Sequence, residues 1–193
     1  MSALRIEAQP HALEWLARET ALVVVDMQNG FLKPGGYFDN VGYDLAHAPA
    51  TICAVKRAVD AARAAGMTRV FIQSGFDRRH LVVGGPTAPV WHKSEAQILM
   101  RERPELAYRL ITDGTWDYDI VDELAPREDE LVVRKSRYSG FAGTALDQVL
   151  RARRIRNLVF AGVAANACVE STLRDAYHHE YFVLLLEDAT HHA

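Results

Sequence analysis

The chain has 193 residues, 49% of them hydrophobic and 24% charged, which is enough apolar material for one substantial globular core. The formal net charge of −3 gives no basic surface that would favour binding to nucleic acid or to an anionic membrane. The longest apolar runs, residues 21–25 and 182–186, are far too short to span a bilayer.

The N-terminal segment has acidic and polar residues where a signal peptide would need an apolar stretch. There are two cysteines, Cys53 and Cys168, so a disulfide framework is not expected and the cytoplasm is the predicted compartment. Cys53 falls within a predicted helix and is expected to be a small core residue.

In chain order, residues 1–19 are polar and are predicted to form an irregular arm on the surface. Residues 21–26, ALVVVD, form a continuous apolar run that ends in Asp26 and is typical of a buried parallel strand. Residues 27–43 are rich in Gly and Asn and are predicted to form a long loop. Residues 48–65 follow as a helix that Gly66 ends.

A second strand is predicted at residues 68–73, which completes a strand–helix–strand unit with the usual right-handed crossover. Residues 74–94 contain a Gly-Gly-Pro sequence and are predicted to be another long loop, of the length that is usually functional. The segment 95–128 is mixed, with a short helix expected near 118–124.

The remainder of the chain continues the alternation of strands and helices. The predicted strands are 131–134, 158–161 and 182–186, and the predicted helices are 144–153 and 168–179. This order favours a three-layer α/β/α fold with a mostly parallel sheet. Residues 1–193 are expected to form one domain.

Three reactive residues follow predicted strands: Asp26, Lys135 and Cys168. Alone, each has an ordinary explanation as a turn residue, a solvated cation or a packed thiol. Because ligands bind at the carboxyl ends of parallel strands, the three side chains are expected to lie together at one edge of the sheet. A thiol at a helix start, with a carboxylate base and a cation, is the equipment of a cysteine nucleophile, and the helix start favours its thiolate.

Other catalytic motifs are absent from the sequence. There is no dinucleotide-binding glycine motif after the first strand, no phosphate-binding P-loop, no H-E-x-x-H and no serine nucleophile elbow. Asp77 and His80 could form a metal pair, but no third ligand follows closely. No metal and no cofactor are therefore expected.

Three motifs together resemble the isochorismatase-like cysteine hydrolases: VVVDMQNGF, VVRKSRYSGFAGT and GVAANACVESTLRDAYHHEYFVLLLEDAT. That family includes nicotinamidases, N-carbamoylsarcosine amidases and ureidoacrylate amidohydrolases. The resemblance runs from residue 21 to residue 190. It is greatest to the ureidoacrylate amidohydrolases of pyrimidine-ring breakdown, through four stretches: PGGYFDNVGYD, GGPTAPVWHKSEA, GTWDYDIVDEL and RYSGF…LDQVLRARRIRNLVFAG.

The resemblance implies a role for each reactive residue. Cys168 is expected to be the nucleophile, Asp26 the general base and acid, and Lys135 the cation that stabilises the thiolate. The family has a cis peptide shortly before its cysteine, which here corresponds to Val163–Ala164. The backbone N–H groups of Ala164 and Cys168 would then form the oxyanion hole.

The expected ligand is a small ureido or amide compound that five side chains are predicted to contact. They are Phe31, Phe76, His92, Lys93 and Tyr138. A cation such as Lys93 would suit a substrate carboxylate. Family members commonly form dimers or tetramers, so a homo-oligomer is expected.

This chain departs from the family pattern at several positions. Ala165 replaces a frequent Thr, Ser136 replaces the Pro of KPRYSGF, and Ser74 and Phe76 stand where the ureidoacrylate subgroup has Asn and Trp. Family members usually continue beyond the EDAT segment, so a chain ending at Ala193 is expected to be truncated at its C-terminus.

Three functions are open on the sequence alone. The first is hydrolysis of (Z)-3-ureidoacrylate to 3-aminoacrylate, carbon dioxide and ammonia through a Cys168 thioester. The second is the same chemistry on nicotinamide or on an N-carbamoyl amino acid, although FDRRHLVVGG lacks the spacing of the nicotinamidase metal site. The third is a non-catalytic member of the same fold.

Overall fold

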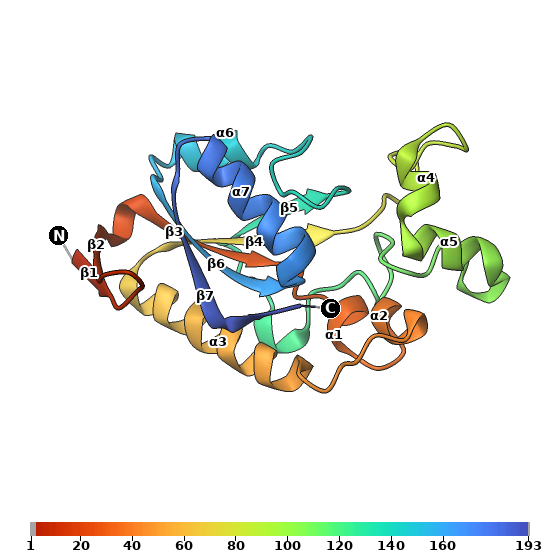
Figure 1. Ribbon diagram of the computed structural model, residues 1–193, viewed down its shortest axis with the longest axis horizontal. Helices are drawn as coiled ribbons and strands as arrows, with labels where there is room; N and C mark the ends of the chain where they lie inside the picture. Colours follow the sequence, from red (N-terminus) through yellow and green to blue (C-terminus); the bar gives the residue numbers. More distant parts are fainter. Residues whose placement is uncertain (1–2, 193) are drawn as a thin grey trace.

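The computed structural model describes residues 3–192 and contains a parallel five-stranded sheet as its centre (Figure 1). Across the sheet the strands are β5 (Leu131–Lys135), β4 (Thr68–Ser74), β3 (Thr20–Val25), β6 (Asn157–Val163) and β7 (Phe182–His191). All four neighbouring pairs are parallel. The predicted α/β fold with a parallel sheet is confirmed.

Helices cover both faces of the sheet (Figure 1). One face carries α3 (Ala48–Ala65), and the other carries α6 (Leu146–Ala152) and α7 (Glu170–His178). Side chains of β3 alternate between the two cores, because successive residues of a strand point to opposite faces. Leu22 and Val24 belong to the α3 side, and Val23 and Val25 to the α6–α7 side.

Two helical excursions leave the sheet at the carboxyl ends of its strands (Figure 1). The first contains α1 (Asn29–Leu32) and α2 (Tyr37–Val41), and the second contains α4 (Pro89–Lys93) and α5 (Glu95–Glu102). The prediction of plain loops at 27–43 and 74–94 was therefore wrong in part. Helices of four or five residues are too short to display a hydrophobic period.

The N-terminal residues form a hairpin, which corrects the prediction of an irregular arm. Strand β1 (Ala3–Ile6) pairs antiparallel with β2 (Leu13–Leu16). Leu4 and Trp15 pack against the α3-side core, so one face of the hairpin is partly buried. Each strand has only four residues, so its alternation of apolar and polar side chains could not be recognised within a mostly polar sequence. A 3₁₀ turn, η1 (Ala17–Glu19), leads into β3.

The helix predicted near 118–124 is reduced to a 3₁₀ turn, η3 (Asp122–Leu124). The residues before it serve the first excursion instead: the Asn29 N–H donates to Asp119 O at 2.9 Å, and the Val121 N–H donates to Met27 O at 3.0 Å. These backbone groups are therefore not available to a helix. A further 3₁₀ turn, η2 (Pro104–Leu106), follows α5.

Three smaller differences concern α3, α7 and β7. Cys53 is exposed rather than in the core, because it lies on the face of α3 that carries Arg57, whose Nη1 is 3.5 Å from the thiol. The helix predicted from residue 168 begins as a π turn, η4 (Ala165–Val169), before α7. Strand β7 extends beyond its predicted end. No helix among residues 3–192 is long and apolar enough to cross a membrane.

Candidate active site

Asp26, Lys135 and Cys168 meet at the carboxyl edge of the sheet. Lys135 Nζ donates to Asp26 Oδ2 at 2.7 Å and lies 3.1 Å from Cys168 Sγ. All three residues are buried, with exposed fractions of 1%, 3% and 9% in that order. The structure therefore brings together the three residues that the sequence placed at this edge.

Each of the three comes from the end of a strand. Asp26 directly follows β3, where its φ of 51° turns the chain and its N–H donates to Ile72 O at 3.0 Å. Lys135 is the last residue of β5, and Cys168 lies in η4, just after β6. Since β3 pairs with both β4 and β6, and β5 pairs with β4, the ends of β3, β5 and β6 lie at the same edge of the sheet.

Two buried polar residues that the sequence analysis missed hold this edge together. The Gln28 side chain donates to Ser74 O and Tyr118 O at 2.9 and 2.8 Å, and accepts the Ser74 N–H at 2.7 Å. Thr172 Oγ1 donates to Cys168 O at 2.6 Å and accepts the Gly140 N–H at 2.9 Å. The sequence offered one indication of them: Gln28 lies two residues after Asp26, and Thr172 lies four residues after Cys168.

Burial governs the ionisation of the site. It raises the pKa of Asp26 above its ordinary value, and the Lys135 ammonium offsets only part of that shift. Burial alone would lower the pKa of Lys135, but Asp26 and Cys168 outweigh it and the pKa is raised, so the side chain stays charged. Asp26 is thus a carboxylate of increased basicity beside a permanent cation.

The burial of Cys168 opposes the thiolate that a helix start would favour. Burial, followed by the nearby Asp26 carboxylate, raises the pKa of the Cys168 thiol to about 12, although Lys135 acts in the opposite direction. Cys168 lies in a π turn and is only 9% exposed, whereas an open helix start would expose the thiol. This environment favours the protonated thiol, which needs a base at the moment of attack.

A base is in place. Asp26 Oδ1 is fully buried and has no hydrogen-bond partner among residues 3–192. A buried carboxylate oxygen without a partner is costly, so it is an acceptor held ready for a proton or a ligand N–H group. The arrangement can remove a proton from Cys168 and hold the resulting sulfur anion next to an ammonium group.

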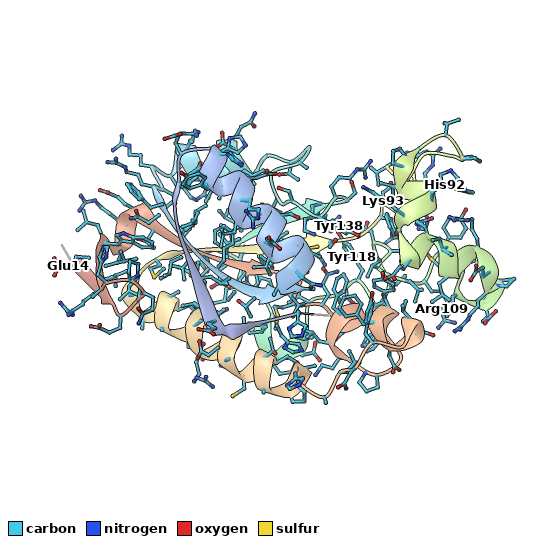
Figure 2. All side chains as sticks on the ribbon, in the orientation of Figure 1. Glu14, His92, Lys93, Arg109, Tyr118 and Tyr138 are labelled. Atoms are coloured by element: carbon cyan, nitrogen blue, oxygen red, sulfur yellow. The ribbon has the colours of Figure 1, made fainter. Side chains whose placement is uncertain are left out.

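A cavity of about 650 Å³ opens onto Cys168. Four of the five predicted contact residues line it: Phe31, Phe76, Lys93 and Tyr138. His92 does not, because its Nε2 lies 2.6 Å from Pro86 O. In Figure 2, Lys93 lies on the side of α4 that faces the sheet and His92 on the opposite side. The prediction of His92 as a contact residue was wrong, since neighbours on a helix point in different directions.

The cavity wall also contains residues that were not predicted. Glu95 Oε2 accepts the hydroxyls of Tyr37 and Tyr43 at 3.3 and 3.0 Å, and all three residues line the cavity. This contact joins α5 to the first excursion. Arg137, two residues after Lys135, lines the cavity as well. Such side chains lie in segments without periodicity, so only their proximity to the reactive residues could have indicated them.

The Val163–Ala164 peptide bond is cis, as the resemblance implied. It connects the end of β6 to η4, and Ala164 lines the cavity. Among residues 3–192 no three His, Cys, Asp or Glu side chains gather as a metal site. Asp77 accepts the N–H groups of Arg79 and Val82, so its carboxylate serves its own loop.

Comparison with known proteins identifies the family. A sequence model described as an isochorismatase domain matches residues 20–193. The chain belongs to the isochorismatase family. A ureidoacrylate amidohydrolase RutB from Azorhizobium caulinodans is 54% identical over 188 residues, which cover 97% of this chain and 83% of the relative.

Solved structures of this family agree with the fold. A cysteine hydrolase from Pseudomonas syringae pv. phaseolicola has a TM-score of 0.73 and 28% identity, covering all of this chain and 78% of that one. An N-carbamoylsarcosine amidase from Thermoplasma acidophilum has a TM-score of 0.68 and 28% identity, covering 91% of this chain and 85% of that one.

Proposed function

We propose that this isochorismatase-family chain is a cysteine amidohydrolase that cleaves the terminal C–N bond of a ureido compound, with (Z)-3-ureidoacrylate as substrate. The observation that carries the proposal is the buried group in which Lys135 Nζ contacts both Asp26 Oδ2 and Cys168 Sγ at the base of a cavity. The 54% identity to a ureidoacrylate amidohydrolase supports the choice of substrate.

In the first half-reaction, Asp26 takes the thiol proton as Cys168 Sγ attacks the ureido carbonyl carbon. Lys135 stabilises the developing charge on sulfur. The backbone N–H groups of Ala164 and Cys168 donate to the carbonyl oxygen as it becomes negative, and each such donor contributes about 3 kcal/mol. The tetrahedral intermediate collapses, the terminal nitrogen takes the proton from Asp26, and ammonia leaves.

In the second half-reaction, Asp26 removes a proton from water, which attacks the carbonyl carbon of the Cys168 thioester. The C–S bond breaks, and sulfur recovers its proton from Asp26. The released carbamate loses carbon dioxide and leaves 3-aminoacrylate. No cofactor is needed, because every proton moves between Asp26, Cys168, water and the substrate.

Ammonia release tests this function on a panel of ureidoacrylate, N-carbamoylsarcosine, nicotinamide and biuret. Ureidoacrylate should give the highest kcat/KM. Replacing Cys168 with Ser should reduce kcat/KM at least about 10³-fold, since a serine hydroxyl is a far weaker nucleophile beside this base. Cys53→Ser is the matched control, because Cys53 lies on the exposed face of α3, and this variant should retain full activity.

A second candidate is an N-carbamoyl amino acid amidase. It is favoured by the TM-score of 0.68 to an N-carbamoylsarcosine amidase. The same residues would perform the same steps. A higher kcat/KM for N-carbamoylsarcosine than for ureidoacrylate in the panel would replace the first candidate by this one.

We further infer a homo-oligomer in the cytoplasm. Leu81, Tyr108 and Trp116 are 67%, 60% and 52% exposed, and large apolar side chains of this kind favour an interface between copies. Both cysteines are free, as in reducing compartments. Light scattering should give the mass of a dimer or tetramer, and a monomer at micromolar concentration would contradict the inference.

A further inference from the structure

Two cations line the cavity without an acidic partner. Lys93 comes from the end of α4, and Arg137 comes from the segment after β5. Among residues 3–192, neither forms an ion pair with Asp or Glu, whereas Arg63 and Arg69 both pair with Glu130. An unpaired cation at the wall of a partly enclosed cavity is a ready partner for an anionic ligand.

The Arg137 guanidinium is held by neutral oxygens alone. Its Nη1 donates to Ser136 O at 2.8 Å and lies 3.3 Å from Ser136 Oγ, and its Nη2 donates to Val82 O at 3.2 Å. A guanidinium has five N–H donors, so these contacts orient the group and leave donors for a ligand. Because no carboxylate approaches it within the described chain, its full charge remains available.

Two acidic groups also line the cavity, Asp26 and Glu95. Asp26 and Lys135 compensate each other at 2.7 Å. The Glu95 carboxylate accepts the hydroxyls of Tyr37 and Tyr43, which are neutral donors, so it keeps its negative charge. The two cations of the lining therefore exceed the uncompensated anions by one. Lys93 and Arg137 are thus the two cationic side chains with which an anionic ligand would pair.

We propose that Arg137, together with Lys93, binds the carboxylate of the substrate and restricts the enzyme to ureido or amide compounds that carry one. This inference rests on the proposed function and deepens it, since it specifies the substrate class. Arginine suits the role because its planar fork can bind both oxygens of a carboxylate. Arg137 is then a specificity residue two positions after the catalytic cation.

Ser136 connects this proposal to the chain's own sequence. The hydroxyl of Ser136 lies against Arg137 Nη1, whereas the proline of the KPRYSGF pattern would offer no hydroxyl. The departure at residue 136 therefore adds a contact that orients the anion-binding group. Ser136 does not replace any of the three reactive residues, Asp26, Lys135 and Cys168.

A pair of alkylating reagents tests the proposal without any turnover. Iodoacetate and iodoacetamide differ in whether a carboxylate or a neutral amide accompanies the same reactive carbon. Peptide mass spectrometry gives their rates at Cys168, inside the cavity, and at exposed Cys53 as an internal reference. The iodoacetate-to-iodoacetamide ratio at Cys168 should fall about tenfold in Lys93→Gln/Arg137→Gln, with no change at Cys53.

Arg137→Lys should retain most of the ratio because it keeps the charge. Arg134→Gln is the matched control, since exposed Arg134 lies in β5, three residues before Arg137, and does not line the cavity. An unchanged ratio at Cys168 in the folded double variant would overturn the proposal. Alkylation requires no turnover. If the ratio falls in the double variant but the wild type does not hydrolyse ureidoacrylate, the anion site is supported and the proposed substrate is refuted.

Kinetics add a second readout when ureidoacrylate is hydrolysed. Arg137→Gln should raise KM for the acid about tenfold with little change in kcat, and should leave kcat/KM for its neutral methyl ester nearly unchanged. Equal kcat/KM values of the wild type for acid and ester would refute the proposal while leaving the proposed reaction intact.

Discussion

Lys135 is the residue that joins the other two reactive groups, because its ammonium contacts both the Asp26 carboxylate and the Cys168 sulfur. Its raised pKa keeps it charged, so the proton that moves during catalysis is shared between Asp26 and Cys168. In the proposed mechanism, the neighbouring Asp26 carboxylate therefore deprotonates the resting Cys168 thiol only during attack.

The pH profile follows from the raised pKa of Asp26. Asp26 must be a carboxylate to accept the thiol proton, so activity should fall as the pH drops through a pKa higher than the ordinary 3.8. Above that value kcat/KM should reach a plateau, because the pKa of Cys168 is about 12 and that of Lys135 is raised. Initial rates of ammonia release across pH measure this profile.

Recovery of full activity after a return to neutral pH is the control for acid unfolding. An acidic limb centred at or below 3.8 would contradict the assignment of Asp26 as a base of raised pKa.

At the scale of elements, the edge formed by β3 and β6 is packed too closely for a side chain at Gly162. This glycine has a φ of 121°, and a Cβ on it would clash with Val25 O. Val25 directly precedes Asp26, and Gly162 directly precedes the cis peptide. One glycine therefore allows the strand that ends at Asp26 to lie beside the strand that leads to Cys168.

Gly162→Ala should consequently reduce the free energy of unfolding by about 3 kcal/mol or more and reduce activity in any protein that folds. Gly85→Ala is the control, because a Cβ there meets no atom within 4 Å and the position has no left-handed φ. Urea unfolding measures both variants. Equal stabilities for the two would show that the close approach at Gly162 is absent.

The same scale explains what the sequence could predict. Apolar runs ending in Asp26 and Lys135 indicated the strands and the edge where reactive side chains meet, because strand ends in a parallel sheet converge. Glu95 and its tyrosine partners could not be predicted, since they come from excursions without periodicity and meet only in three dimensions. The protonated state of Cys168 could not be predicted either, because it depends on burial.

At the scale of the whole molecule, an ion network ties the α3 layer to the sheet. Glu130, just before β5, accepts from Arg63 of α3 at 2.8 and 2.9 Å and from Arg69 of β4 at 2.9 Å. Its carboxylate is fully buried. Burial alone would raise the pKa of Glu130, but hydrogen bonds from Arg63, the Arg127 N–H and Arg69 lower it to about 2.

Glu130→Gln should lower the free energy of unfolding at neutral pH by about 2 kcal/mol, because it removes the buried carboxylate that Arg63 and Arg69 share. The two arginines would keep only their more exposed partners, Asp60 and Asp129. A lowered folded-state pKa stabilises the protein above the unfolded value of 4.5, and this contribution is lost as pH falls toward 2. The difference from wild type should therefore shrink between about pH 5 and about pH 2. Exposed Glu128→Gln is the control, and a pH-independent difference would contradict this explanation.

The central claim is that the Cys168 thiol attacks the substrate, and rapid-quench mass spectrometry tests it most directly. During turnover of ureidoacrylate, the peptide that contains Cys168 should carry an adduct equal to the substrate minus ammonia, and Cys168→Ser should carry none. The adduct should disappear as the substrate is exhausted. Ammonia release at an undiminished rate in Cys168→Ser, without an adduct on the wild-type peptide, would contradict the account.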